Sequence, residues 1–172
     1  MSKYITKKNL YILTPFILVA LAFLSGSSYK SNEVELKSDI VSENGVNLYA
    51  HLSIKIKGEN IKIPAGIGFL APFGSNGMPV VLHTHSGKGI IAAEMEGVVT
   101  RNQLMLKNFF HSWGKDFSED SIFGNKAGEE GEMKMFINGL PNYDFENYVI
   151  TGKGRYNAGS FGYIDDIEII YE

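Results

Sequence analysis

Two histidines separated by one residue are the strongest chemical signal in this sequence. His83 and His85 lie in the run Leu82-His83-Thr84-His85, which follows two valines and is typical of a strand. Residues two apart on a β-strand point to the same face, so we expect both imidazoles to reach one ion. Imidazole nitrogens favour zinc, copper, iron or nickel over calcium or magnesium. The pair therefore predicts part of a transition-metal site.

Other side chains are candidate ligands for the same ion. His51 lies on the polar face of an alternating run, and it adds a third nitrogen if its strand lies beside that of the histidine pair. In the strand-like run after the pair, Glu94 and Glu96 share a face, so either carboxylate can add an oxygen. We predict a site for a divalent transition metal, copper or zinc, with the ligands His51, His83, His85 and Glu94. The competing interpretation is that these histidines are structural, because four histidines in 172 residues are not an enrichment.

The rest of the composition restricts other chemistry. The chain has no cysteine, which excludes disulfide scaffolds, iron–sulfur clusters and thiol nucleophiles. A glycine-rich stretch, 152–162, lacks the Gly-Lys-Ser/Thr ending of a phosphate-binding loop, and no nucleophile lies in a recognisable catalytic pattern. We therefore predict no catalytic residues, and we favour metal binding or delivery over enzymatic activity. The alternative hypothesis is a metal-free extracytoplasmic module that serves protein interaction or structure.

The N-terminus has the pattern of an export signal. Three lysines in the first eight residues precede an uncharged apolar stretch, 10–24, which small residues follow. As a helix this stretch rises about 22 Å, short of a bilayer core of about 30 Å, although the wider uncharged segment 9–27 is longer. We predict that residues 1–27 are either a cleaved signal peptide or a single-pass membrane anchor. In both cases the positive-inside rule places the domain outside the cell membrane, either anchored or secreted.

The charge of the exported part argues against nucleic acid as a partner. Three of the 16 basic residues lie in 1–27, which leaves 13 basic against 19 acidic residues, a net charge of −6. Proteins that grip phosphate backbones without base contacts need a basic stripe, and none is present here. The expected partners are the membrane, through residues 9–27 if they are retained, and under the alternative hypothesis a protein.

Strands make up most of the elements that position these residues. A polar tether, 28–44, precedes a single domain, 45–172. Alternation and turn residues predict strands at 48–56, 61–63, 80–85, 89–95, 133–137, 148–151 and 163–171. The first four form two hairpins, and Asn138-Gly139 predicts a tight turn after the fifth. The stretches 65–79 and 115–132 are expected to be loops.

Residues 101–113 carry the clearest helical pattern. Apolar side chains recur there at helical spacing up to Trp113, and Gly114 is typical of a helix C-terminus. Before the helix, Thr100 and Gln103 have the spacing of a capping box. The fold class that we predict is α+β, with a mainly antiparallel sheet and one amphipathic helix. A small β-sandwich is the alternative.

The chain resembles a set of small, uncharacterised prokaryotic proteins that are exported or membrane-anchored. The resemblance spans residues 51–114 and rests on the strand 82–85, on a Gly-Ile-Ile strand with a later glutamate, and on a Phe-Phe-x-x-Trp-Gly helix end. It implies no established activity. Three positions depart from the pattern: Tyr49 and Ala92 stand where histidine often occurs, and Ser86 replaces an acid. If the set binds metal, this chain has fewer potential ligands.

Overall fold

The structure is a computed structural model that describes residues 39–69, 80–128, 130–157 and 162–172. The chain divides into two compact units, Met1–Ile40 and Val41–Glu172, and the second contains the main sheet and its helix. Residues 1–27, the predicted signal or anchor, lie outside the described ranges, as does most of the predicted tether. Within those ranges, no helix combines the length and the apolar character needed to cross a bilayer.

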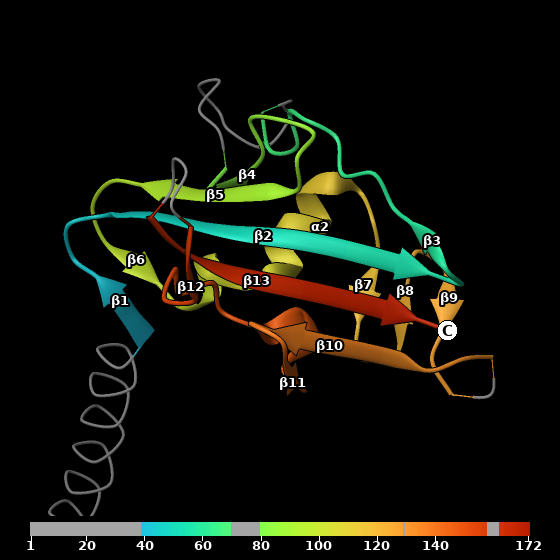
Figure 1. Cartoon of the computed structure of the whole chain (residues 1–172). Coiled ribbons are helices and arrows are strands. Elements are labelled where there is room, and N and C mark those ends of the chain that lie inside the picture. The colour runs from blue at the N-terminus through green and yellow to red at the C-terminus, as the bar shows by residue number, and fades with distance from the viewer. Residues whose placement is uncertain (1–38, 70–79, 129, 158–161) are drawn as a thin grey trace, which may run out of the picture. The chain divides into compact units, whose positions relative to one another are not determined.

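Two long neighbouring strands form the centre of the main sheet. β2 (Val46–Ile56) and β13 (Gly162–Tyr171) run parallel, with Leu52 opposite Ile167 (Figure 1). The strand order is β11-β10-β13-β2-β5-β4, and every other pairing in this sheet is antiparallel. The other members of the sheet are β3 (Glu59–Asn60), β4 (Leu82–His83), β5 (Ile90–Met95), β10 (Met133–Ile137), β11 (Leu140–Asn142) and β12 (Arg155–Asn157).

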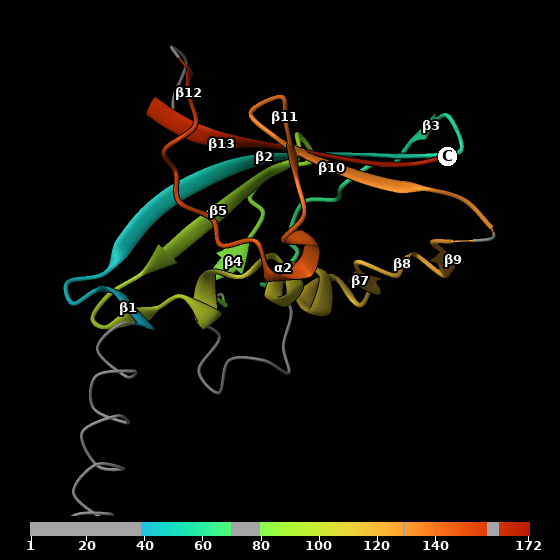
Figure 2. The same cartoon turned by 90° about the horizontal axis from the view of Figure 1, so that it is seen from below.

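The core lies on one face of this sheet. Figure 2 shows the helix α2 (Leu106–Trp113) and the small sheet of β7 (Phe117–Ser118), β8 (Ser121–Ile122) and β9 (Asn125–Lys126) on the same side of the main sheet. Alternate residues of the central strands are buried toward them: Ala50, Leu52, Ile54, Ile91, Ala93, Ile167, Ile169 and Tyr171. The residues between them therefore face the opposite way, and we call that surface the open face of the sheet.

The predicted fold class is confirmed: the chain is α+β, with a mainly antiparallel sheet and an amphipathic helix. The hairpin of β4 and β5 and the hairpin of β10 and β11 form as expected. In the second, Asn138 and Gly139 have φ angles of 55° and 80°, the left-handed values that a tight two-residue turn requires. The parallel neighbour of β2 is the last strand of the chain, which local patterning does not reveal.

The predicted helix 101–113 is wrong at its N-terminal end. The structure has a 3₁₀ helix, η1 (Asn102–Leu104), then Met105 in an extended conformation, and only then α2. Leu106 N donates to Tyr148 O and Ile150 N donates to Leu104 O, so a distant segment interrupts the helix. Gln103 does accept from Thr100 N at 2.8 Å, which is half of the predicted capping box. Gly114 ends the helix with a φ of 68°, as predicted.

Two other predictions are corrected. The stretch 115–132 is not all loop, because β7, β8 and β9 form a small sheet there. Residues 148–151 are not a strand of the main sheet; Val149 forms an isolated bridge with Met105 instead. Outside the main sheet, β1 (Ile40–Ser42) pairs with β6 (Val99–Thr100), and a second 3₁₀ helix, η2, covers Phe145–Asn147. The predicted loop 65–79 is described only as far as Phe69.

The buried carboxylate of Asp165 in β13 binds the backbone of residues 151–153, which follow the Val149 bridge. Asp165, which is 1% exposed, accepts hydrogen bonds from the backbone N–H groups of Thr151, Gly152 and Lys153 at 2.6–3.1 Å. The Thr151 hydroxyl donates to the same carboxylate at 3.1 Å. These bonds satisfy the charge within the protein, so Asp165 has a structural role.

Candidate metal centre

His83 and His85 point to the same side of the chain because Thr84 points to the other. The Thr84 side chain is completely buried, and its Oγ1 donates to Pro64 O at 2.9 Å and accepts from Ile67 N at 3.1 Å. The backbone of Thr84 also pairs with Gly66 and Ile67. The 64–67 segment therefore holds the middle residue of the His-x-His pair in place, and the two imidazoles come together as the period-two pattern predicts.

Glu94 joins the pair from the neighbouring strand. In the register of β4 and β5, His83 lies opposite Ala92, and Glu94 is two residues further along the same face of β5. Ala92 is 1% exposed and is therefore covered by its neighbours. Among all described His, Asp and Glu residues, the group that can share one ion consists of His83, His85 and Glu94.

The three donor atoms form a compact triangle. His83 Nε2 is 3.1 Å from His85 Nε2, and Glu94 Oε2 is 3.4 Å from the first nitrogen and 3.6 Å from the second. A tetrahedral zinc ion with bonds of about 2.0–2.2 Å separates its ligand atoms by about 3.3–3.6 Å. The observed triangle contains a point about 2.0 Å from all three atoms. The donor set is thus already spaced for a first-row transition metal.

His83 is the anchored member of this cluster. Its side chain is 0% exposed, and its Nδ1 lies 3.1 Å from Val80 O. A carbonyl oxygen can only accept, so Nδ1 carries a proton, and in the neutral imidazole this leaves the lone pair on Nε2, the nitrogen that faces the cluster. A hydrogen bond of this kind, from the far ring nitrogen to a backbone carbonyl, is the usual support of a metal-binding histidine. The ring of Phe69 packs edge-on against His83 at a centroid distance of 4.8 Å.

Tyr49 supports the carboxylate from the opposite side. Its hydroxyl donates to Glu94 Oε1 at 2.9 Å, which leaves Oε2 facing the imidazoles. Burial of the phenol, and then its hydrogen bond to Glu94, raises the pKa of Tyr49, so the hydroxyl keeps its proton as a donor. Tyr49 is therefore a positioning residue of the cluster. Sequence reasoning noted this position only as one where a histidine was missing.

His51 does not reach the cluster. Its predicted role as a ligand required its strand to lie beside the histidine pair, and this condition is not met, because β5 lies between β2 and β4. His51 Nδ1 instead contacts Asp166 Oδ1 at 2.9 Å, on the neighbouring parallel strand. His51 has this partner because β13, from the C-terminal end of the chain, pairs with β2 and places Asp166 opposite His51. Glu96, the other carboxylate considered, is not part of the cluster either.

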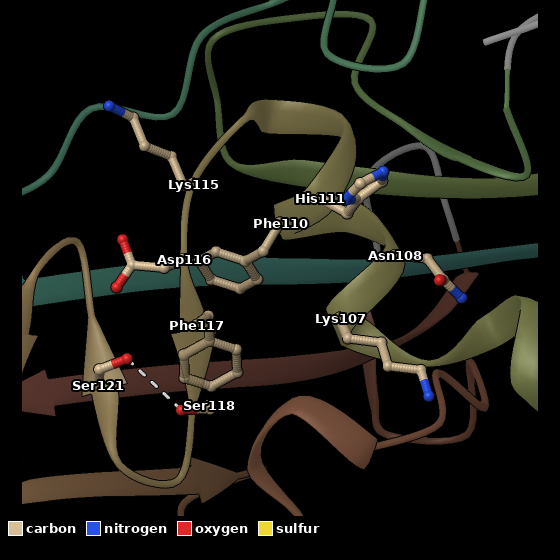
Figure 3. A pocket seen from close by; sticks show the side chains of 9 residues that line it. All are labelled: Lys107, Asn108, Phe110, His111, Lys115, Asp116, Phe117, Ser118 and Ser121. Atoms are coloured by element: carbon tan, nitrogen blue, oxygen red, sulfur yellow. Dashed lines mark hydrogen bonds between the residues drawn. The ribbon is translucent and has the colours of Figure 1, made fainter.

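A hollow of about 430 Å³ lies elsewhere, between α2 and the strands β7 and β8. Figure 3 shows Lys107, His111 and Lys115 at this hollow, with their side chains pointing in different directions. Ser118 and Ser121 also line it, with their hydroxyl oxygens 3.5 Å apart. Because the basic groups diverge, they do not build a common site for an anion. His111 lies in the last turn of α2, where a basic side chain is favourable.

The departures from the resemblance fall close to the cluster. Tyr49 and Ala92 are directly opposite each other in the register of β2 and β5, on the open face. Ser86 lies in the turn between β4 and β5. At the first two positions the chain has a phenol that bonds Glu94 and a buried alanine, so the donor set among the described residues is His83, His85 and Glu94.

In comparisons with known proteins, no family model, no curated protein and no solved structure matches the chain.

Proposed function

We propose that this protein binds one divalent transition-metal ion, zinc or copper, through His83, His85 and Glu94. The observation that carries the proposal is the spacing of the three donor atoms, 3.1–3.6 Å, around a common point. Two imidazoles and a carboxylate form a borderline donor set, which suits zinc and copper better than calcium or magnesium. Relative to the sequence-based ligand set, the proposal omits His51.

Contacts around the cluster support the proposal. Val80 O sets the tautomer of His83, Tyr49 holds Glu94, and Thr84 fixes the backbone between the two histidines. Metal sites need such outer contacts, because they reduce the ordering that binding would otherwise require. We propose binding and delivery of the metal rather than catalysis, in a domain that the N-terminal segment carries to the outer side of the cell membrane.

A titration of the full-length chain tests the proposal. We expect the purified, metal-free protein to bind one equivalent of Zn²⁺ or Cu²⁺ at micromolar concentration, measured by calorimetry and by elemental analysis after gel filtration. His83→Ala/His85→Ala should lose this binding. The matched control is His51→Ala/His111→Ala, which also removes two of the four histidines but leaves the cluster intact. Circular dichroism of each variant checks that it is folded.

The competing hypothesis is a metal-free module, and it makes a different prediction. Without a metal, a proton must lie between the two Nε2 atoms, since bare lone pairs 3.1 Å apart repel each other. The cluster is then a hydrogen-bonded His–His–Glu group that stabilises the sheet edge. Absence of bound metal would refute our proposal and favour this hypothesis, whereas equal binding by the two double variants would refute the assignment of His83 and His85 as ligands.

A further inference from the structure

We propose that the metal leaves this site by ligand substitution, in which an anionic donor group of an acceptor enters an open coordination position and displaces His85. This inference rests on the proposed function and specifies how the bound ion is delivered. It follows from two properties of the cluster: the number of protein ligands, and the unequal burial of the two histidines.

Among the described residues, the coordination shell contains three protein ligands. A tetrahedral ion takes four ligands, and the described part of the chain brings three metal-binding side chains together. The stretch 70–79, which follows Phe69 in the chain, contains no His, Asp, Glu or Cys. A site with three protein ligands keeps a position for water or another exchangeable group. An incoming donor can therefore bind the ion before any protein ligand has left.

The two histidines differ in how firmly they are held. The side chain of His83 is 0% exposed and bonded to Val80 O, whereas that of His85 is 59% exposed. His85 contacts the tilted ring of Phe69 at a centroid distance of 5.3 Å, and its Nε2 faces the cluster. An exposed side chain regains rotamer freedom when it is released, which lowers the free energy of its departure. His85 is thus the leaving ligand and His83 the anchor.

Charge indicates the class of donor that the ion accepts. A divalent ion with one carboxylate and two neutral imidazoles keeps a net charge of about +1. An anionic donor, such as a carboxylate or thiolate of an acceptor protein, neutralises this charge. In the exchange the first donor atom of the acceptor would bond to the ion in place of the exchangeable fourth ligand, which leaves. A second donor would then replace His85 Nε2, and further donors would replace Glu94 and, last, His83, so that each bond broken to the protein is matched by one formed to the acceptor. The oxidation state of the metal does not change, and the imidazole departs neutral.

The kinetics of zinc transfer test this mechanism. Full-length protein loaded with one equivalent of Zn²⁺ is mixed with an excess of the anionic chelator pyridylazoresorcinol, and the coloured complex is followed by stopped-flow absorbance. We expect the observed rate constant to rise linearly, about tenfold, over a tenfold range of chelator concentration. A rate constant that does not depend on chelator concentration would mean that the zinc dissociates first, which overturns the inference while leaving metal binding intact. Failure of the protein to load zinc at all would refute the proposed function and the inference together.

Variants at the two histidines test which ligand leaves. His85→Ala, loaded at saturating zinc, should transfer its ion at least about tenfold faster than the unmodified protein, because the leaving ligand is absent. His83→Ala should not retain zinc through gel filtration. Equal loss of zinc by both variants, or retention by His83→Ala alone, would overturn the assignment of anchor and leaving ligand. His51→Ala is the control, since it removes another partly exposed imidazole, 40% against 59% for His85, from outside the cluster, and it should transfer zinc at the unmodified rate.

Discussion

Replacing Tyr49 with phenylalanine tests the support of the metal site without touching a ligand. The substitution removes the hydroxyl that donates to Glu94 Oε1 at 2.9 Å, and keeps the aromatic ring. The Glu94 side chain is 37% exposed, so without this bond it can rotate toward water. Metal binding must then order the carboxylate again, which costs about 1–1.5 kcal/mol of side-chain entropy. Since 1.4 kcal/mol is a factor of ten in an equilibrium constant, we expect the Kd for Zn²⁺ to rise about tenfold.

Two measurements read out this effect. Direct calorimetric titration gives Kd, and urea unfolding with and without saturating Zn²⁺ gives the stabilisation by metal, which falls by about 1.4 kcal/mol for a tenfold weaker Kd. The control is Tyr143→Phe, because Tyr143 is 81% exposed and lies outside the cluster. An unchanged Kd in Tyr49→Phe, or an equal loss in the control, would show that the hydroxyl does not position Glu94 for the metal.

Three further predictions concern the scaffold around the site. Thr84→Val removes the buried hydroxyl that bonds Pro64 O and Ile67 N. Because these two backbone groups are then unsatisfied, the free energy of unfolding in urea titrations should fall by about 2–3 kcal/mol. The variant should also bind zinc more weakly. Stability should fall above about pH 10, because burial and the neighbouring Asp165 raise the pKa of Tyr148 above its ordinary value of 10.0. The unfolded phenol loses its proton in that range while the folded one keeps it, so the free energy of unfolding should fall by up to about 1.4 kcal/mol per pH unit. Tyr148→Phe should reduce this pH dependence, measured by urea unfolding at about pH 9 to 11. An unchanged pH dependence in the variant would contradict the assignment to Tyr148. Gly114→Ala forces alanine to the left-handed φ of 68° at the end of α2, and should cost about 1 kcal/mol in thermal unfolding, whereas no loss would mean that the helix end relaxes.

Local patterning predicted those elements whose partners lie nearby in the sequence. The hairpin of β4 and β5 follows from two apolar runs around a Ser-Gly-Lys-Gly turn, and α2 follows from helical spacing and Gly114. These predictions succeeded because a short turn or a helix end depends on a few adjacent residues. The same holds for the His-x-His pair, whose common direction is a property of extended backbone.

Contacts across long stretches of chain account for the failures. Residues 101–105 have helical spacing, yet Tyr148 and Ile150 bond the backbone of Leu104 and Leu106 and open the helix there. Likewise, the sequence pattern does not reveal the order of strands in the sheet, on which the place of His51 relative to the histidine pair depends. Because β5 pairs with both β2 and β4, the strand of His51 lies two strand spacings, about 9.5 Å, from the strand of His83.

The sequence by itself determined the chemistry that is available: no thiols, few histidines, and two of them two residues apart. It also determined the period-two burial that gives the sheet a core face and an open face. Only the tertiary structure decided that Glu94 completes the histidine pair, that Tyr49 holds its second oxygen, and that His51 bonds Asp166 instead. The physical reason is that ligand identity is a property of side chains, whereas ligand geometry depends on strand order and register, which contacts between distant segments set.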